Sequence, residues 1–271
     1  MKDVIKNYFE SKNIEYYAVL DYSVCKKINP QIMAREDFTP RSVIVYVLPY
    51  YTGETENLSR YAASLDYHLA LREIADGLIE AMTRTDPDAR AKGYGDHSPI
   101  DEVGAALLSG LGLIGDNGLL INERYGSYVF IGDVVTDIAP ASLGATEPRE
   151  PERCHHCGAC KGACPTGILR GEGEDCLSAI TQRKGELSLT ECELMIKHNT
   201  VWGCDLCQSV CPYNRDPRIT PIEFFHRDRI VTLTRGLLDS MDKESFRTRA
   251  FAWRGRRVVE RNLDIFGERY K

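Results

Sequence analysis

The stretch CHHCGACKGACP (residues 154–165) decides how this chain is organised. Its cysteine spacing, C-x2-C-x2-C-x3-C-P, is that of bacterial ferredoxins, in which short loops wrap three thiolates around one face of a [4Fe–4S] cubane. A second run, CDLCQSVCP (residues 204–212), also ends in Cys-Pro. In paired runs of this kind the cysteine before the proline ligates the other cluster. The two runs therefore predict a ferredoxin-like segment with two [4Fe–4S] clusters.

The cluster ligands follow from this exchange between the two runs. One cluster is expected to take Cys154, Cys157, Cys160 and Cys211, and the other Cys164, Cys204 and Cys207. These are seven thiolates, whereas two cubanes need eight, and both Cys176 and Cys192 are candidates for the missing one. Cys176 is favoured because it lies only 12 residues after Cys164, whereas Cys192 stands in a helix-like stretch between acidic residues.

Structural zinc is the alternative interpretation of these cysteines, because paired CxxC motifs also bind zinc. Two Cys-Pro runs and a surplus of thiols fit zinc poorly. His155 and His156 are more simply explained as loop residues that tune a cluster by charge or hydrogen bonding.

Composition sets the class of protein. The chain has 271 residues, 43% of them hydrophobic, with 34 Lys and Arg against 40 Asp and Glu and a net charge of −6. These values allow a sizeable core and exclude disordered and collagen-like chains. The sequence contains no run of about 18 apolar residues, so no membrane span is expected. The start MKDVIKNYFESK lacks the apolar region of a signal peptide. We therefore expect a cytoplasmic protein, in which clustered thiols favour metal or redox chemistry over disulfides.

Charge is distributed unevenly along the chain. Residues 226–271 contain 12 Lys and Arg against 7 Asp and Glu, so the remainder is strongly acidic. A basic end of this kind indicates either a polyanion-binding surface or a solvated helical face, and the second is at least as common. Within it, the segment 247–261 with Phe251 and Trp253 is a candidate for part of a tRNA surface, although Trp253 is equally suited to a core.

Periodicity predicts a mixed α+β N-terminal domain. Helices are expected over 2–12 and 58–84, the second with an apolar stripe, and a buried strand over 42–51. Another helix should begin with Ser98 as N-cap and Pro99 as its first residue, and end after Ser109. Strands are expected within 119–136, around a turn at Tyr125 and Gly126. A loop over 140–153 then separates the domains, which we place at 1–145, 146–218 and 219–271.

Two further motifs are ambiguous when read from the residues alone. GLGLIG (residues 110–115) matches the G-x-G-x-x-G dinucleotide pattern, but it ends a predicted helix instead of opening one. We therefore expect a tight turn or close approach to a large ligand there, and no nicotinamide site. Asp96, just ahead of a predicted helix, is either a turn residue, the favoured interpretation, or a general acid whose pKa a buried site would raise.

Several stretches together resemble the epoxyqueuosine reductases, cobalamin-dependent iron–sulfur enzymes of queuosine-tRNA biosynthesis. They follow the family order over roughly residues 40–265. They are SRYA (59–62) with DYH (66–68), D-x-x-P-x-x-E (96–102), G-L-G-x-I-G-x-N (110–117), YGS (125–127) with IG (131–132), the cysteine runs with CLS (176–178) and W-G-C-D-x-C-Q (202–208), and RN (261–262).

The resemblance implies a corrinoid bound over an α/β-sandwich-like N-terminal domain, beside the nearer cluster. Electrons would come from an external low-potential donor of flavodoxin or ferredoxin type, and reduced cobalt would act on the epoxide of the modified wobble nucleotide in tRNA. It implies that Asp96 is the proton donor and that Cys176 is a cluster ligand. The residues it places near the cobalamin are Tyr61, Asp96, Leu120, Ser127 and Ile131.

The sequence also departs from the family pattern. Leu113 stands where the family usually has Trp, and Asp116 where it usually has Lys, a change expected to weaken a phosphate contact. The chain stops soon after residues 261–262, whereas long members continue into a helical-repeat tail that grips tRNA, so we expect a short form. The alternatives are a corrinoid and iron–sulfur reductase of another substrate, like the reductive dehalogenases, and a non-catalytic ferredoxin-type carrier, which needs neither a corrinoid pocket nor a positioned acid.

Overall fold

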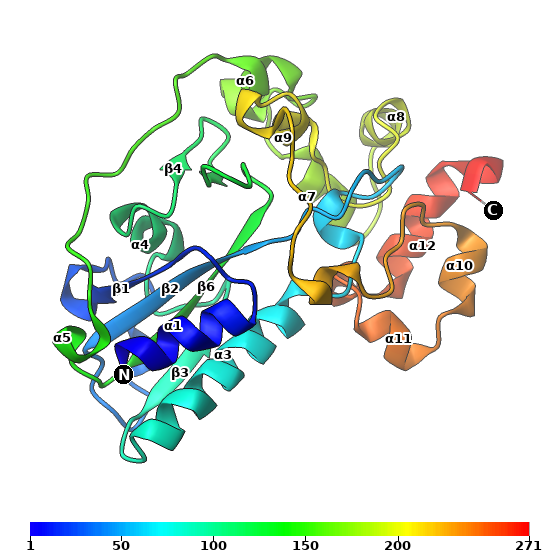
Figure 1. Ribbon diagram of the computed structural model, residues 1–271. Helices are drawn as coiled ribbons and strands as arrows, with labels where there is room; N and C mark the ends of the chain where they lie inside the picture. The colour runs from blue at the N-terminus through cyan, green and yellow to red at the C-terminus, as the bar shows by residue number, and fades with distance from the viewer. Residues whose placement is uncertain (271) are drawn as a thin grey trace. The chain divides into compact units, whose positions relative to one another are not determined.

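The computed structural model describes residues 1–270 (Figure 1). Its chain divides into two compact units: unit 1 contains residues 1–49 and 68–156, and unit 2 contains residues 50–67 and the chain from Cys157 onward. Helices and strands are mixed, so the predicted α+β class is confirmed. The three-part division at residues 145 and 218 stays a prediction.

Unit 1 is built on a four-stranded antiparallel sheet of order β1-β2-β6-β3 (Figure 1). The strands are β1 (Tyr17–Asp21), β2 (Ser42–Pro49), β3 (Ala91–Tyr94) and β6 (Val129–Thr136). All eight residues of β2 are buried, which is expected of an uncharged, β-branched strand in the middle of a sheet. In the register of β2 and β6, Tyr46 lies opposite Gly132 and Val45 opposite Asp133.

Helices cover both faces of this sheet. On one face, the Tyr46 hydroxyl donates to the Leu71 carbonyl of α3 (Tyr67–Thr85) at 3.2 Å, and its ring lies 5.4 Å from that of Phe9 in α1 (Lys2–Ser11). On the other face, α4 (Glu102–Leu108) adds Ala105 and Ala106 to a core shared with β2 and β6. The remaining elements of unit 1 are α2 (Pro30–Met33), β4 (Leu113–Ile114), β5 (Leu120–Ile121) and α5 (Pro140–Leu143).

The helix predicted over 58–84 is wrong at its start, because α3 begins only at Tyr67. The preceding residues belong to unit 2, where Leu58 forms a β-bridge with Trp202 and the Asp66 N–H donates to the Thr248 carbonyl at 2.7 Å. These tertiary backbone pairings compete with helical hydrogen bonding, so the apolar period of residues 58–66 produces only a short 3-10 turn at Arg60–Ala62 and no α-helix.

The helix predicted to begin at Ser98 also begins later. Asp101 is the N-cap of α4, and its Oδ1 accepts the Gly104 N–H at 2.9 Å. The Pro99 carbonyl accepts the N–H groups of Ile28 and Asn29, which keeps residues 98–100 outside the helix. The predicted end of the helix is confirmed, because α4 stops at Leu108 with Ser109 as its C-cap.

Unit 2 is formed mainly by short helices around an apolar core that contains Trp202 and Phe251, both fully buried. The Asn262 side-chain amide donates to the carbonyls of Thr181 and Val201 at 2.7 Å each, and so joins three segments of this core. The helices are α6 (Ala159–Ala163), α7 (Leu177–Gln182), α8 (Leu189–Lys197), α9 (Leu206–Ser209), α10 (Arg235–Ser240), α11 (Lys243–Arg247) and α12 (Arg256–Ile265).

The basic C-terminal segment has both a buried and an exposed part. Trp253 is 59% exposed, and the Arg254 guanidinium lies 3.7 Å from its ring centroid. Arg256 instead donates to the carbonyls of Leu238 and Met241. Part of the local positive charge therefore serves the fold. Across residues 1–270, every helix is too short or too polar to span a bilayer.

Replacement of Asn262 by Ala should destabilise unit 2. It leaves the buried carbonyls of Thr181 and Val201 without their donor, at a cost of about 2 to 4 kcal/mol in the free energy of unfolding. Anaerobic denaturant titration followed by fluorescence measures this loss. Asp264→Ala on the same helix is the control, since it removes an exposed ion pair with Arg235 that is worth at most about 1 kcal/mol. Equal effects of the two substitutions would contradict the prediction.

Candidate functional site

The two cysteine runs fold into similar loops within unit 2. Cys160 lies in the short helix α6 and Cys207 in the short helix α9, and these two helices pack against each other (Figure 1). Cys164 directly follows α6, Cys211 comes two residues after the end of α9, and each is followed by proline. All ten cysteines of the chain are free thiols, so each remains available as a thiolate ligand.

Cys164 is surrounded by backbone N–H groups. The residue is 7% exposed, and burial alone would raise the pKa of its thiol. The backbone N–H groups of Leu169, Thr166 and Gly167, together with the Thr166 hydroxyl, outweigh burial and lower this pKa below its ordinary value. A buried cysteine whose thiolate form is favoured by such donors fits the ligand of a metal cluster.

Cys204 lies in electrostatic contact with two other thiols. Burial raises the pKa of Cys204 to about 12, and the thiols of Cys176 and Cys207 contribute to the rise. Cys192 instead lies near the Arg261 guanidinium. Burial lowers the pKa of this guanidinium, and the nearby Cys192 raises it. The structure thus brings Cys176, and not Cys192, to the second cysteine run.

The second run is anchored by the buried carboxylate of Asp205, which is 8% exposed. Asp205 accepts the Ser59 hydroxyl at 2.5 Å, the Arg60 N–H at 2.6 Å and the Gln208 side-chain amide at 3.1 Å. Gly203, just before this loop, has φ of +75°, and a Cβ there would lie 2.3 Å from the Ser59 Cβ. Only glycine allows the loop to approach residues 59–60 so closely.

Tyr61, one of the predicted cobalamin neighbours, lies in unit 2 next to this loop. Its hydroxyl accepts the Trp202 indole N–H at 2.9 Å. Three other predicted neighbours lie in unit 1: Leu120 and Ser127 are buried, and Ile131 is half-buried on β6. Leu120 and Ile131 belong to the same apolar cluster, on the face of the sheet that α4 covers.

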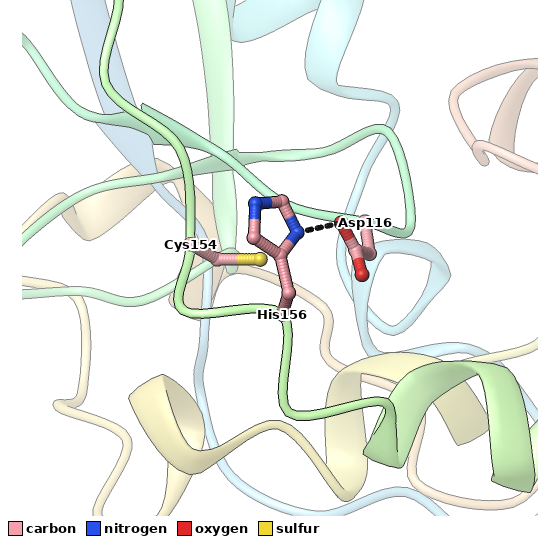
Figure 2. A group of neighbouring side chains, drawn as sticks. All are labelled: Asp116, Cys154 and His156. Carbon is pink, nitrogen blue, oxygen red and sulfur yellow. Dashed lines mark hydrogen bonds and ion pairs between the residues drawn. The ribbon is translucent and has the colours of Figure 1, made fainter.

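A cluster of possible ligand atoms lies at the end of unit 1 (Figure 2). The His156 Nδ1 is 2.7 Å from Asp116 Oδ1, and the Cys154 sulfur lies within 4.8 Å of both side chains. Asp116 is only 11% exposed at its side chain. Its carboxylate is therefore directed at His156, and this histidine is fixed beside the first cysteine of the run.

Asp96 lies on the loop between β3 and α4 in a strained conformation, with φ of +60°. Its backbone N–H donates to Glu102 Oε1 at 3.1 Å, which ties the loop to the first residue of α4. Its carboxylate lies 3.3 Å from His68 Nε2 of α3, with both side chains about half exposed. A pocket of about 200 Å³ lies beside this loop, lined in part by His68, Tyr94 and His97.

Behind Asp96 lies a pair of buried carboxyl groups. Burial raises the pKa of Asp133, which is fully buried on β6, to about 7, against an opposing effect of its neighbours Ser98 and Glu102. Burial, followed by repulsion from Asp133 and Asp96, raises the pKa of Glu102 to about 8. Two carboxyl groups in such a place cannot both be ionised at neutral pH.

Sequence reasoning missed this pair and the contact between His68 and Asp96. One signal was present: Asp133 is the single charged residue in an otherwise uncharged strand, VFIGDVVT (129–136). Alternation places it with Ile131 and Val135 on a buried face, where an isolated carboxylate is unfavourable. Its partner Glu102, however, comes from α4, and only the packing of that helix on the sheet brings the two together.

Comparison with known proteins shows which families this chain is similar to. Residues 153–214 match the family model of the 4Fe-4S double cluster binding domain. The epoxyqueuosine reductase of Listeria monocytogenes is 32% identical over 97% of this chain and 72% of its own length. That of Gloeobacter violaceus is 38% identical over 64% of this chain and 56% of its own length.

A solved structure extends the similarity to the fold. It is that of an epoxyqueuosine reductase with an epoxyqueuosine-modified tRNA stem loop, which matches with a TM-score of 0.74 and 22% identity over 97% of this chain and 80% of that one. At the sequence level, the relative from Listeria is matched over more than two thirds of both chains. The chain therefore belongs to the epoxyqueuosine reductase family.

Proposed function

We propose that the protein reduces epoxyqueuosine to queuosine in tRNA, with two [4Fe–4S] clusters and cobalamin as cofactors. The observation that carries this proposal is the 32% identity to an epoxyqueuosine reductase over 97% of the chain. The two alternatives, reduction of a different substrate and a pure electron carrier, have no comparable support. The positioned Asp96 loop also distinguishes the chain from a carrier, which needs no acid.

The clusters are proposed to be held by eight cysteines. The N–H groups around Cys164 and the closeness of Cys176 and Cys207 to Cys204 support these thiols as ligands. We assign one cluster to Cys154, Cys157, Cys160 and Cys211 and the other to Cys164, Cys176, Cys204 and Cys207. When bound, the clusters would pass single electrons from an external low-potential donor, which we propose to be a flavodoxin or ferredoxin.

The corrinoid is proposed to bind over unit 1. A flat macrocycle with an apolar face fits half-buried apolar side chains, and Ile114, Val129 and Ile131 are such residues at the edge of the core under α4. Leu120 and Ser127 are proposed to support this surface from below. Tyr61, which lies in unit 2, stays a predicted neighbour of the corrinoid. When bound, the corrinoid would supply a strongly reducing cobalt centre.

Asp96 is proposed to protonate the epoxide oxygen as its C–O bond opens. Its half-exposed carboxyl can reach a bound nucleotide, and the hydrogen bond from its N–H to Glu102 fixes the loop that carries it. A general acid placed in this way contributes roughly 10²- to 10⁴-fold to the rate. We propose that Asp96 has this role, and His68 then acts as the partner that orients it.

The substrate is proposed to be tRNA in the cytoplasm. The solved relative with a tRNA stem loop supports this assignment, as does the exposed Trp253 with its stacked Arg254 in the basic segment. Exposed aromatic and guanidinium planes of this kind are used to stack on unpaired bases.

Iron content tests the eighth ligand. Cys176→Ala should lower the iron content of anaerobically reconstituted protein, because it removes a thiolate beside Cys204. Cys192→Ala is the matched control and should retain the iron of the wild type, since this thiol lies near Arg261. Loss of iron in the second variant alone would reverse the assignment.

Reconstitution tests the function itself. Protein with both clusters should retain cobalamin through desalting, visible in its absorption spectrum, and should convert epoxyqueuosine in tRNA to queuosine when a chemical reductant is supplied. Mass spectrometry of the digested tRNA measures the product. Absence of bound cobalamin would overturn the cofactor assignment, whereas bound cobalamin without product would overturn the substrate assignment.

Asp96→Asn should retain both cofactors and lose about 100-fold or more of its turnover, because the amide has no proton to donate to the epoxide oxygen. Asp88→Asn is a control of the same chemical change at an exposed turn residue of unit 1, and should keep a much larger share of the activity. Unchanged turnover of Asp96→Asn would show that Asp96 is only a turn residue.

A further inference from the structure

Three carboxyl groups follow one another from the surface of unit 1 into its core. Asp96 is half exposed, Glu102 is half-buried at the start of α4, and Asp133 is fully buried on β6. Glu102 Oε1 accepts the Asp96 N–H at 3.1 Å, and the charges of both Asp96 and Asp133 act on Glu102. Glu102 therefore stands between a half-exposed acid and a buried one.

The surroundings of Asp133 do not neutralise its charge. The titratable groups that face it from neighbouring elements are Tyr46 of β2, Tyr94 of β3, Tyr22 and Cys25. Burial raises the pKa of each of these groups, to about 11 for Cys25, so all four are neutral at pH 7. No cation pairs with Asp133 among residues 1–270, and its neighbours Ser98 and Glu102 offset only part of the effect of burial on its pKa.

A dianionic pair in this place would be strongly disfavoured, because a buried carboxylate with no cation beside it loses more solvation than one neighbouring hydroxyl replaces. The pair can relieve the cost by holding one proton between Glu102 and Asp133. It is then a single acid with one removable proton, and its half-buried member reaches toward the loop of Asp96.

We propose that Glu102 and Asp133 form a proton reservoir that restores the proton of Asp96 after each transfer to the substrate. This role rests on the proposed function and deepens it. Removal of an epoxide oxygen as water breaks both of its C–O bonds and consumes two electrons and two protons. The electrons come from the low-potential donor. Asp96 delivers the first proton to the oxygen and becomes a carboxylate, and bulk water supplies the second proton as the oxygen leaves. The proton of the pair then moves through Glu102 to Asp96, and water at the half-exposed end of Glu102 returns it.

Glu102 and Asp133 act through Asp96, so they are positioning and proton-supplying residues. The reservoir therefore matters for repeated turnover more than for the first. An enzyme that begins with Asp96 protonated should complete one transfer without the pair, and should slow only when Asp96 must be recharged.

Two measurements on the full-length protein with both clusters and cobalamin test the proposal. Infrared titration should show a protonated carboxyl band at pH 7 that disappears as the pH rises past about 8, the pKa of Glu102. The band should persist in the control Glu147→Gln, an exposed loop residue, and be missing from the double variant Glu102→Gln/Asp133→Asn. A wild type without the band would overturn the proposal, whether or not the protein reduces tRNA.

Rapid-mixing kinetics supply the second measurement. Glu102→Gln should keep the first-turnover rate and KM of the wild type, while its steady-state kcat falls roughly 100-fold. An equal fall of the first turnover would mean that Glu102 only holds the Asp96 loop, and would overturn the reservoir. If the wild type reduces no epoxyqueuosine at all, the proposed function fails, and the infrared band alone then decides whether the pair holds a proton.

Discussion

The hydrogen bonds of the Asp205 carboxylate are the constraint on which unit 2 depends. A carboxylate that is 8% exposed is tolerated only when donors replace the water it has lost. Ser59, Arg60 and Gln208 supply them, and the first two come from about 146 residues earlier in the chain. The bonds therefore fasten the segment 50–67 to the second cysteine run.

The anchored carboxylate of Asp205 also fixes the position of its neighbours in the chain. Cys204 and Cys207 flank it in the chain, so the direction in which their thiols point depends on the same anchor. Gly203 allows the backbone to pass close to Ser59, and Trp202 fills the core immediately before it. The loop that presents the thiols is thus tied to residues 59–60 by the hydrogen bonds of the Asp205 carboxylate.

Much of the fold could be predicted from local pattern. The buried strand β2 and the helix α1 follow from uncharged β-branched sequence and from amphipathic period, and both occur where they are expected. The prediction of an α-helix over residues 58–66 was wrong because that segment pairs with Trp202 and Thr248, which lie far along the chain. Period alone cannot foresee a competition with partners so distant in sequence.

The candidate site, like the fold, could be predicted from the sequence only in part. The cysteine runs are contiguous motifs whose spacing encodes a double cluster domain, and the family model matches that segment. The motif in the sequence identified Asp96, but it did not predict the positive φ of this residue or its contact with His68. The pairing of Glu102 with Asp133 depends on how α4 packs over β6, which no short stretch of sequence records.

Unit 2 is built from two stretches that are far apart in the sequence, and this matters while the chain is being synthesised. Residues 50–67 leave the ribosome early, yet the partners of Leu58 and Ser59 are Trp202 and Asp205, which are synthesised much later. Unit 1 has all of its residues once His156 has emerged. Until residues 202–205 have been synthesised, residues 50–67 form a loop within unit 1 that lacks its partners, and Leu58 cannot pair with Trp202. The nascent chain therefore leaves Leu58 without its partner until Trp202 has been synthesised.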